Sequence, residues 1–159
     1  MKRSFALIMI LLPLLCLGIT RQVALDGSQA YTTIQTAIND AVSGDMVLVH
    51  PGRYLENIDL TNKSNLILAS FEYTTADTSY ISSTIIDGSN GNSSTILCYE
   101  NTNNCTISGL SITGGQGYDY YNGTSPYQIF GGGIFIYTNN MVILRNLNIY
   151  DNMTSWGGG

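Results

Sequence analysis

The sequence is poor in charged side chains, and it contains few prolines, three cysteines and a single histidine. Charged residues make up 11% of the 159 positions and leave a net charge of −5, so the basic surface that nucleic-acid binding requires is absent. No nucleic-acid partner is therefore expected. The 17 glycines have no three-residue period, which excludes a collagen helix. A hydrophobic content of 44% argues against disorder.

The chain instead contains many Asn, Ser, Thr and Gly residues between short apolar runs. This composition is typical of a β protein with many turns. A length of 159 residues leaves room for one domain and for no separate cofactor module. We therefore expect a single β domain.

The first residues have the pattern of a secretory signal peptide. Two basic residues precede an almost unbroken apolar run over residues 5–17, and small side chains follow where a signal peptidase cuts, after Gly18 or shortly beyond. The apolar run is shorter than the roughly 20 residues of a membrane span. We expect residues 1–20 to be a signal peptide and residues 21–159 to form the domain. The protein is then secreted or held at the cell surface, with no membrane span after cleavage.

One segment has the periodicity of a helix. Apolar residues recur at i, i+3, i+4 and i+7, which predicts a helix over residues 32–41. The stripe consists of Ile34, Ala37, Ile38 and Ala41. Thr32 followed by Gln35 fits a capping box at its start. Because this helix precedes all the strands, we expect it to cover the first strand edge as an N-terminal cap.

Short strands and turns fill the rest of the chain, and part of it repeats. Leu110 corresponds to Leu147 and Ile112 to Ile149, an offset of 37 residues, or 23 after removal of an irregular stretch of 14 residues. A repeat of this length made of short strands predicts a parallel β-helix, a solenoid whose coils stack and bury inward aliphatic columns. The rival fold is an antiparallel β-sandwich, but tight hairpin dipeptides are scarce.

The repeat also predicts where the chain bends. Gly109 and Asn146 occupy equivalent positions, and both residue types enter a left-handed bend at low cost. Asparagines on successive coils are expected to stack in hydrogen-bonded ladders.

Several short motifs follow one another near the start of the domain. They are Asp26-Gly27-Ser28, Tyr31-Thr32-Thr33-Ile34-Gln35-Thr36-Ala37-Ile38, Gly44-Asp45-Met46-Val47-Leu48-Val49, Pro51-Gly52-Arg53-Tyr54 and Glu56-Asn57-Ile58. Their order resembles the N-terminal cap and first coil shared by pectin esterases and by many secreted bacterial proteins with the pectin-lyase-like fold. The resemblance covers residues 23–159 and implies an all-β, right-handed parallel β-helix with an N-terminal capping α-helix.

The resemblance does not extend to an active site. Pectin esterases use two aspartates, a glutamine and an arginine, and no segment of this chain matches those motifs. A polysaccharide lyase of this fold would need a cationic base and usually a Ca²⁺ site of clustered carboxylates. Whether the protein is an enzyme stays open. No cofactor is expected unless it is a lyase that uses Ca²⁺, and no metal ligand is assigned.

Seven residues are candidates for ligand binding. They are Tyr118, Asp119, Tyr120, Tyr121, Tyr127, Arg145 and Asp151. The tyrosine-rich loop suits the stacking and hydroxyl binding of a polysaccharide, or else its rings cover the side of the solenoid and shield the core. Arg145 lies within a coil. Asp119 and Asp151 are the pair that we consider for a hydrolase, although each is also explained as a solvated or turn residue.

Export leaves Cys98 and Cys105 as an even pair in an oxidising compartment. Either they form a disulfide, which needs Cα atoms within about 7 Å, or they lie on separate strands as small core residues. Their spacing, with no histidine nearby, does not fit a metal site.

The sequence stops at Gly157-Gly158-Gly159, whereas Gly131-Gly132-Gly133 leads directly into a strand. We therefore expect a β-helix that is incomplete at its C-terminus and self-associates through its open end.

The leading hypothesis for function is a secreted or cell-surface interaction scaffold with a polysaccharide partner. One alternative is the N-terminal part of a carbohydrate-active enzyme, a polysaccharide lyase or pectin esterase without its catalytic coils. The other is a structural stalk or adhesin repeat.

Overall fold

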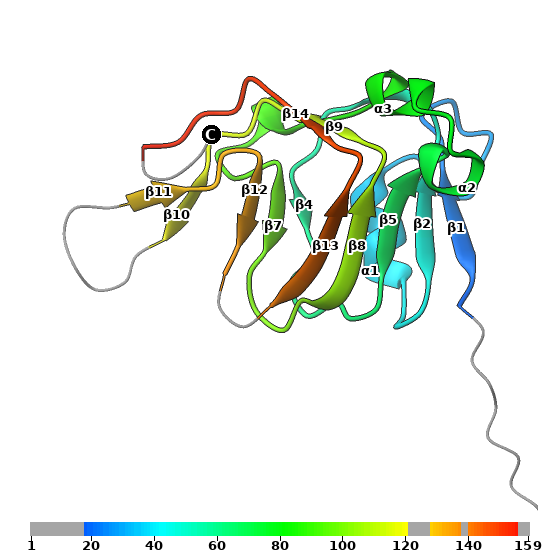
Figure 1. The fold of residues 1–159 in the computed structure, drawn as a ribbon, viewed down its shortest axis with the longest axis horizontal. Helices are drawn as coiled ribbons and strands as arrows, with labels where there is room; N and C mark the ends of the chain where they lie inside the picture. Colours follow the sequence, from blue (N-terminus) through cyan, green and yellow to red (C-terminus); the bar gives the residue numbers. More distant parts are fainter. Residues whose placement is uncertain (1–17, 121–127, 138–139, 156–159) are drawn as a thin grey trace, which may run out of the picture.

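A computed structural model describes residues 18–120, 128–137 and 140–155, and within them the chain is mostly β (Figure 1). The expected signal peptide lies almost wholly outside these residues. The all-β class is confirmed, and the three larger sheets consist of parallel strands.

Three parallel sheets make up the body of the fold. The five-stranded sheet consists, in spatial order, of β1 (Thr20–Val23), β2 (Met46–Val49), β5 (Ile67–Ser70), β8 (Asn103–Ser108) and β13 (Met141–Arg145). The four-stranded sheet consists of β3 (Gly52–Tyr54), β6 (Thr84–Asp87), β9 (Ser111–Thr113) and β14 (Asn148–Ile149). The three-stranded sheet consists of β4 (Ile58–Asp59), β7 (Ile96–Cys98) and β12 (Ile134–Ile136).

The chain visits these sheets in a fixed order. From β2 it passes through β3 and β4, returns to the five-stranded sheet at β5, and repeats the same circuit from β5 and from β8. Each strand therefore pairs in parallel with the strand one circuit earlier, as Ile67 does with Met46. The predicted equivalence of Ile112 and Ile149 is confirmed, because they are register partners in β9 and β14.

Aliphatic side chains from all three sheets fill the interior. In the five-stranded sheet, Val47, Leu68 and Ile107 are successive register partners, and all three are fully buried. Burial of one such side chain contributes about 1.5–3 kcal/mol. Columns of this kind hold successive circuits together.

Helix α1 (Ile34–Asp40) packs against β1, β2 and β4, at the end of the fold where the circuits begin. The predicted apolar stripe is buried along its whole length. Helix α1 therefore covers part of the interior beside these first strands.

The predicted capping box at Thr32 and Gln35 is wrong. The N-cap residue is Thr33, whose side chain makes no capping hydrogen bond. The N–H groups of Ile34 and Gln35 instead donate to the carboxylate of Glu56, at 2.8 and 2.9 Å. The helix is capped by a residue of the following circuit, which local sequence spacing does not reveal.

Two insertions were not predicted as regular structure. Helices α2 (Glu72–Thr75) and α3 (Ser79–Ser83) lie between β5 and β6, and a short 3-10 turn, η1 (Gly88–Asn90), follows β6. Strands β10 (Tyr118–Tyr120) and β11 (Gln128–Phe130) form an antiparallel hairpin between β9 and β12.

Across the described residues, no helix combines the length and apolar character that crossing a membrane would take.

The predicted asparagine ladders are present on two bends. The Nδ2 group of Asn101 donates to Oδ1 of Asn62 at 2.9 Å, and Asn104 donates to Asn65 in the same way at 2.8 Å. All four residues have left-handed backbone conformations, with φ between 52° and 63°. Asparagine tolerates this conformation, so each ladder joins equivalent bends of neighbouring circuits.

The two cysteines of the domain have free thiols in the structure and are not joined by a disulfide. Cys98 belongs to β7 of the three-stranded sheet, whereas Cys105 belongs to β8 of the five-stranded sheet, and both are buried in the core. Burial raises the pKa of Cys98 to about 12. The arrangement corresponds to the alternative of small core residues on separate strands.

Candidate functional site

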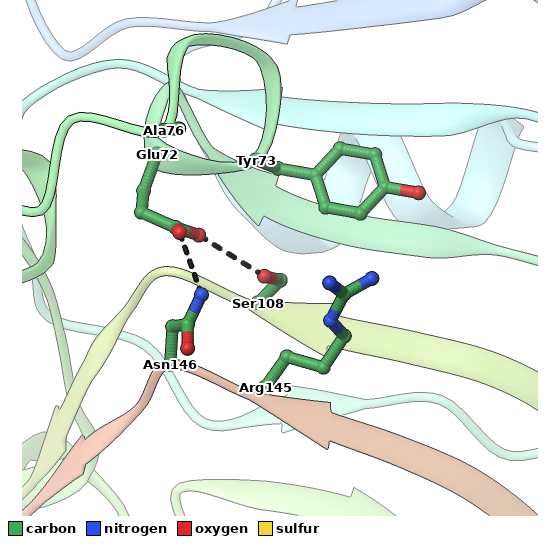
Figure 2. A pocket seen from close by; sticks show the side chains of 6 residues that line it. All are labelled: Glu72, Tyr73, Ala76, Ser108, Arg145 and Asn146. Atoms are coloured by element: carbon green, nitrogen blue, oxygen red, sulfur yellow. Dashed lines mark hydrogen bonds between the residues drawn. The ribbon is translucent and has the colours of Figure 1, made fainter.

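A polar pocket of about 460 Å³ lies beside the end of β13, between helix α2 and the five-stranded sheet (Figure 2). Its lining residues are Glu72, Tyr73, Ala76, Ser108, Arg145 and Asn146. The first three belong to α2 and its C-cap, and the other three come from the ends of β8 and β13. The insertion after β5 therefore builds one wall of the pocket, and two later circuits build the other.

Glu72 is the central side chain of this pocket, and it is only 6% exposed. One carboxylate oxygen accepts a hydrogen bond of 2.6 Å from Nδ2 of Asn146, and the other accepts one of 3.2 Å from the hydroxyl of Ser108. These bonds offset part of the cost of burying a carboxylate. A carboxylate can accept about four hydrogen bonds, so Glu72 keeps acceptor capacity for a ligand.

The bend that follows β8 makes room for Glu72. Gly109 has a φ of +70°, and a Cβ atom there would lie 2.7 Å from the Cβ of Glu72. One circuit later, Asn146 occupies the equivalent bend with a φ of +49°. The predicted equivalence of these two bends is confirmed. In the structure, the glycine leaves space for the carboxylate and the asparagine donates to it.

Arg145 is the predicted site residue that the structure places in the pocket. It is the register partner of Ser108, which in turn pairs with Ala69, so the three form one column on the sheet. Figure 2 shows its guanidinium on the same side of the pocket as the Tyr73 ring. Among the described residues, no carboxylate forms an ion pair with Arg145, whereas Arg21 and Arg53 each have one.

Tyr118 belongs to an aromatic cluster on another part of the surface. Its ring stacks on Phe135 with centroids 5.2 Å apart, and it lies 5.6 Å from the ring of Tyr99. Tyr99 in turn stacks on Tyr137 at 5.0 Å. Tyr118 is half-buried in this cluster.

The remaining predicted residues do not join the Glu72 pocket. Asp119 is exposed on β10, and Tyr120 ends that strand. Tyr121 and Tyr127 lie outside the described residues. Asp151 is an exposed turn residue after β14, with a φ of +50°. Figure 1 shows the β10–β11 hairpin on the opposite side of the molecule from α2, so Tyr118 and Asp119 lie far from Arg145.

Sequence reasoning missed Glu72, Tyr73 and Ser108. Glu72 and Asn146 are 74 positions apart in the chain, and they meet because the insertion after β5 lies beside the bend that follows β13, two circuits later. Asn146 was recognised as a bend residue, but its role as a donor to Glu72 has no local signal. Within the described ranges, no three His, Cys, Asp or Glu side chains gather closely enough to hold a metal ion.

Comparison with known proteins gives one informative similarity. No protein family matches the chain. A cell surface glycoprotein of Methanothermus fervidus is 34% identical over an alignment of 142 positions, and the alignment covers 76% of this chain and 23% of the glycoprotein. The chain therefore spans less than a quarter of the length of this curated relative.

Proposed function

We propose that the chain is a secreted or cell-surface protein built as a right-handed parallel β-helix, and that it is an interaction scaffold that binds polysaccharide in the Glu72 pocket. The strand order supports the fold, because each circuit adds one parallel strand to each of three sheets. The similarity to a cell surface glycoprotein supports the location. A fold that grows by stacking circuits also suits an extended surface structure.

The observation that carries the binding proposal is the buried carboxylate of Glu72 in one pocket with the guanidinium of Arg145, which forms no ion pair with any described carboxylate. Glu72 is held in place by Ser108 and Asn146 and can accept hydrogen bonds from sugar hydroxyls. Arg145 offers up to five N–H donors to hydroxyl or acidic groups of a sugar. The half-buried ring of Tyr73 adds an apolar face next to these polar groups.

The same geometry favours binding over catalysis. A glycoside hydrolase uses two carboxyl groups about 5 to 10 Å apart, and the residues that line the pocket include one acid. Arg145 does not suit the role of a general base, because a guanidinium has five N–H donors and no acceptor atom. An acceptor that Ser108 and Asn146 hold in place, together with the cation of Arg145 in the same pocket, suits the recognition of a ligand.

The test is a titration of the full chain with two soluble polysaccharides, polygalacturonate and a neutral glucan, by affinity electrophoresis or calorimetry. We expect Glu72→Gln and Arg145→Gln each to weaken binding about tenfold or more, since a hydrogen bond to a charged group contributes about 1.5–3 kcal/mol. Asp119→Asn is the matched control, because it removes an exposed carboxylate on the distant hairpin.

The outcomes separate the candidate functions. If Asp119→Asn or Tyr120→Ala weakens binding and the pocket variants do not, the binding site lies in the hairpin and the pocket assignment is wrong. If neither polysaccharide binds the unmodified chain, the binding proposal fails and a structural stalk or adhesin repeat remains. That alternative is favoured by the stacking of circuits, which requires no ligand.

A further inference from the structure

The first described residues lie against a buried carboxylate. The backbone nitrogen of Ile19 donates a hydrogen bond of 2.9 Å to Oδ1 of Asp45. Asp45 is 1% exposed and directly precedes β2, and β1 begins one residue after Ile19 with the pairing of Thr20 and Met46. Ile19 thus directly precedes the first strand of the fold.

Asp45 is surrounded by donors on both carboxylate oxygens. Oδ2 accepts from the backbone N–H of Val42 at 3.0 Å and from Nε of Arg21 at 3.1 Å, and it forms an ion pair with Arg21 at 3.0 Å. Burial opposes ionisation, but the hydrogen bonds from Val42, Ile19 and Arg21 outweigh it and lower the pKa of Asp45. The group is a carboxylate at neutral pH, with Oδ1 facing Ile19 and Oδ2 facing Arg21.

We propose that export cleaves the chain between Gly18 and Ile19, and that the α-ammonium group so created pairs with Asp45 and fastens β1 to the fold. The proposal rests on the export part of the proposed function and is independent of polysaccharide binding. The sequence pattern puts small residues before this bond, where a signal peptidase cuts. A cut here keeps all of β1, whereas a cut after Thr20 would remove its first residue.

The chemistry of the step is a simple hydrolysis. A signal peptidase adds water to the Gly18–Ile19 peptide bond, so that Gly18 leaves with the leader as a carboxylate. The Ile19 nitrogen keeps its hydrogen, gains one from water and takes up a further proton at neutral pH. The atom that donated one neutral hydrogen bond to Oδ1 then carries a positive charge and three hydrogens, and hydrogen bonds between charged partners are roughly twice as strong as neutral ones.

The surroundings of Ile19 accommodate this charge. Its side chain is 53% exposed beside an open hollow of about 300 Å³, so water can reach the remaining hydrogens of the ammonium group. The other titratable groups near Asp45 are Arg21, Tyr31 and Asp40. Arg21 donates to the Tyr31 hydroxyl at 2.9 Å, and that hydroxyl donates to Asp40 at 3.1 Å, so Asp40 adds a second negative charge nearby.

The first test is the mass of the exported protein. The full chain, with its own first 18 residues, is produced in an exporting host, and the intact mass and N-terminal peptide of the product are measured. We expect the mature chain to begin at Ile19. A product that begins at any other residue, or that keeps the leader, overturns the proposal.

The second test isolates the charge. Two forms are released from a ubiquitin fusion, one beginning at Ile19 and one beginning at Gly18, which differ by one glycine and by whether the Ile19 nitrogen is an amine or an amide. We expect the Ile19 form to have a folding equilibrium constant about fivefold larger at pH 7, in line with a well-placed ion pair. Equal stability at pH 7 contradicts the pairing.

The dependence on pH gives an independent check. An α-ammonium in an unfolded chain loses its proton near pH 7.7–8.0, and a neighbouring carboxylate raises that pKa in the folded chain. The advantage of the Ile19 form is then complete below about pH 7.7 and disappears as the pH rises through the raised value. A difference that persists at pH 10.5 excludes the ammonium as its cause.

The Asp45→Asn variant removes the partner of the ammonium, so the two forms should be equally stable in that background. If that variant does not fold, the pH series alone tests whether the ammonium pairs with Asp45.

Discussion

At the scale of single residues, the pocket depends on a bend where a side chain cannot be tolerated. The sequence predicted the left-handed bends at Gly109 and Asn146, because both residue types adopt positive φ. It could not predict that Glu72 fills the space beside Gly109, since that depends on how the insertion after β5 folds back over the sheet. The backbone conformation at Gly109 could be predicted from the sequence, but the residue that lies beside it could not.

Gly109→Ala should therefore be more costly than an ordinary glycine substitution. The new Cβ meets both a positive φ and the Cβ of Glu72 at 2.7 Å, so we expect a loss of about 2–3 kcal/mol in the free energy of unfolding, measured by urea titration. Gly27→Ala is the control, because Gly27 has a φ of +75° with no atom within 4 Å of the new Cβ. It should cost about 1–2 kcal/mol. Equal losses in the two variants would show that the contact with Glu72 is unimportant.

A second prediction at this scale concerns acid stability. Asp87 is buried; its carboxylate accepts from the N–H of Ser89 at 3.0 Å and from Nε of Arg53 at 2.8 Å. Burial opposes its ionisation, but the bonds from Ser89 and Arg53 lower the pKa of Asp87 below its ordinary value. Its contribution to stability is present above the unfolded pKa of about 3.9 and is lost as the pH falls through the folded value. Urea titrations from pH 2 to 6 should show a shallower acid loss for Asp87→Asn, and parallel curves would contradict this role.

At the scale of elements, helix α1 is held at both ends by the circuit that follows it. Glu56 accepts the first N–H groups, and Nζ of Lys63 donates to the carbonyls of Asn39 and Ala41 at 3.2 and 3.0 Å. A negative group at the N-terminus and a positive group at the C-terminus both complement the helix dipole. A helix of seven residues is too short to be stable alone, so its stability comes from these contacts and from its buried stripe.

Glu56→Gln should destabilise the protein by about 1 kcal/mol, because the amide retains one acceptor oxygen but loses the charge and the second hydrogen bond. Chemical denaturation measures the change. Glu100→Gln is the matched control, since Glu100 is exposed and it is Glu56, not Glu100, that accepts from the first N–H groups of α1. If the two variants lose the same stability, Glu56 does not cap the helix.

The elements that the sequence predicted are those with a strong local pattern. The stripe at Ile34, Ala37 and Ile38 marked α1, and short apolar runs marked most strands of the parallel sheets. Helices α2 and α3 were missed because four or five residues are too few for a periodic stripe. The pocket was missed with them, since one of its walls is α2.

At the scale of the whole molecule, the two ends of the stack differ. Helix α1 packs against β1, β2 and β4 at the end where the circuits begin. Within the described residues, the last strands β12, β13 and β14 each have one strand partner, as the first strands β1, β3 and β4 do. Val142 and Leu147 pack against the core, but Leu144 and Ile149 remain 43% exposed where a further circuit would bury them. In a longer chain the next circuit would cover this surface.

We therefore expect the 159-residue chain to self-associate through the edge formed by β13 and β14. A filament needs head-to-tail contacts between different ends of the molecule, and α1 packs at the other end. We therefore expect two copies to meet through the same edge and form a closed dimer. The double variant Leu144→Lys/Ile149→Lys places charges on both exposed positions and should sediment as a monomer at concentrations where the unmodified chain dimerises. Leu55→Lys, at a leucine that is 57% exposed between β3 and β4, should leave the dimer intact. A chain that remains monomeric at high concentration would contradict the prediction, and growth into long polymers would show that α1 does not block its end.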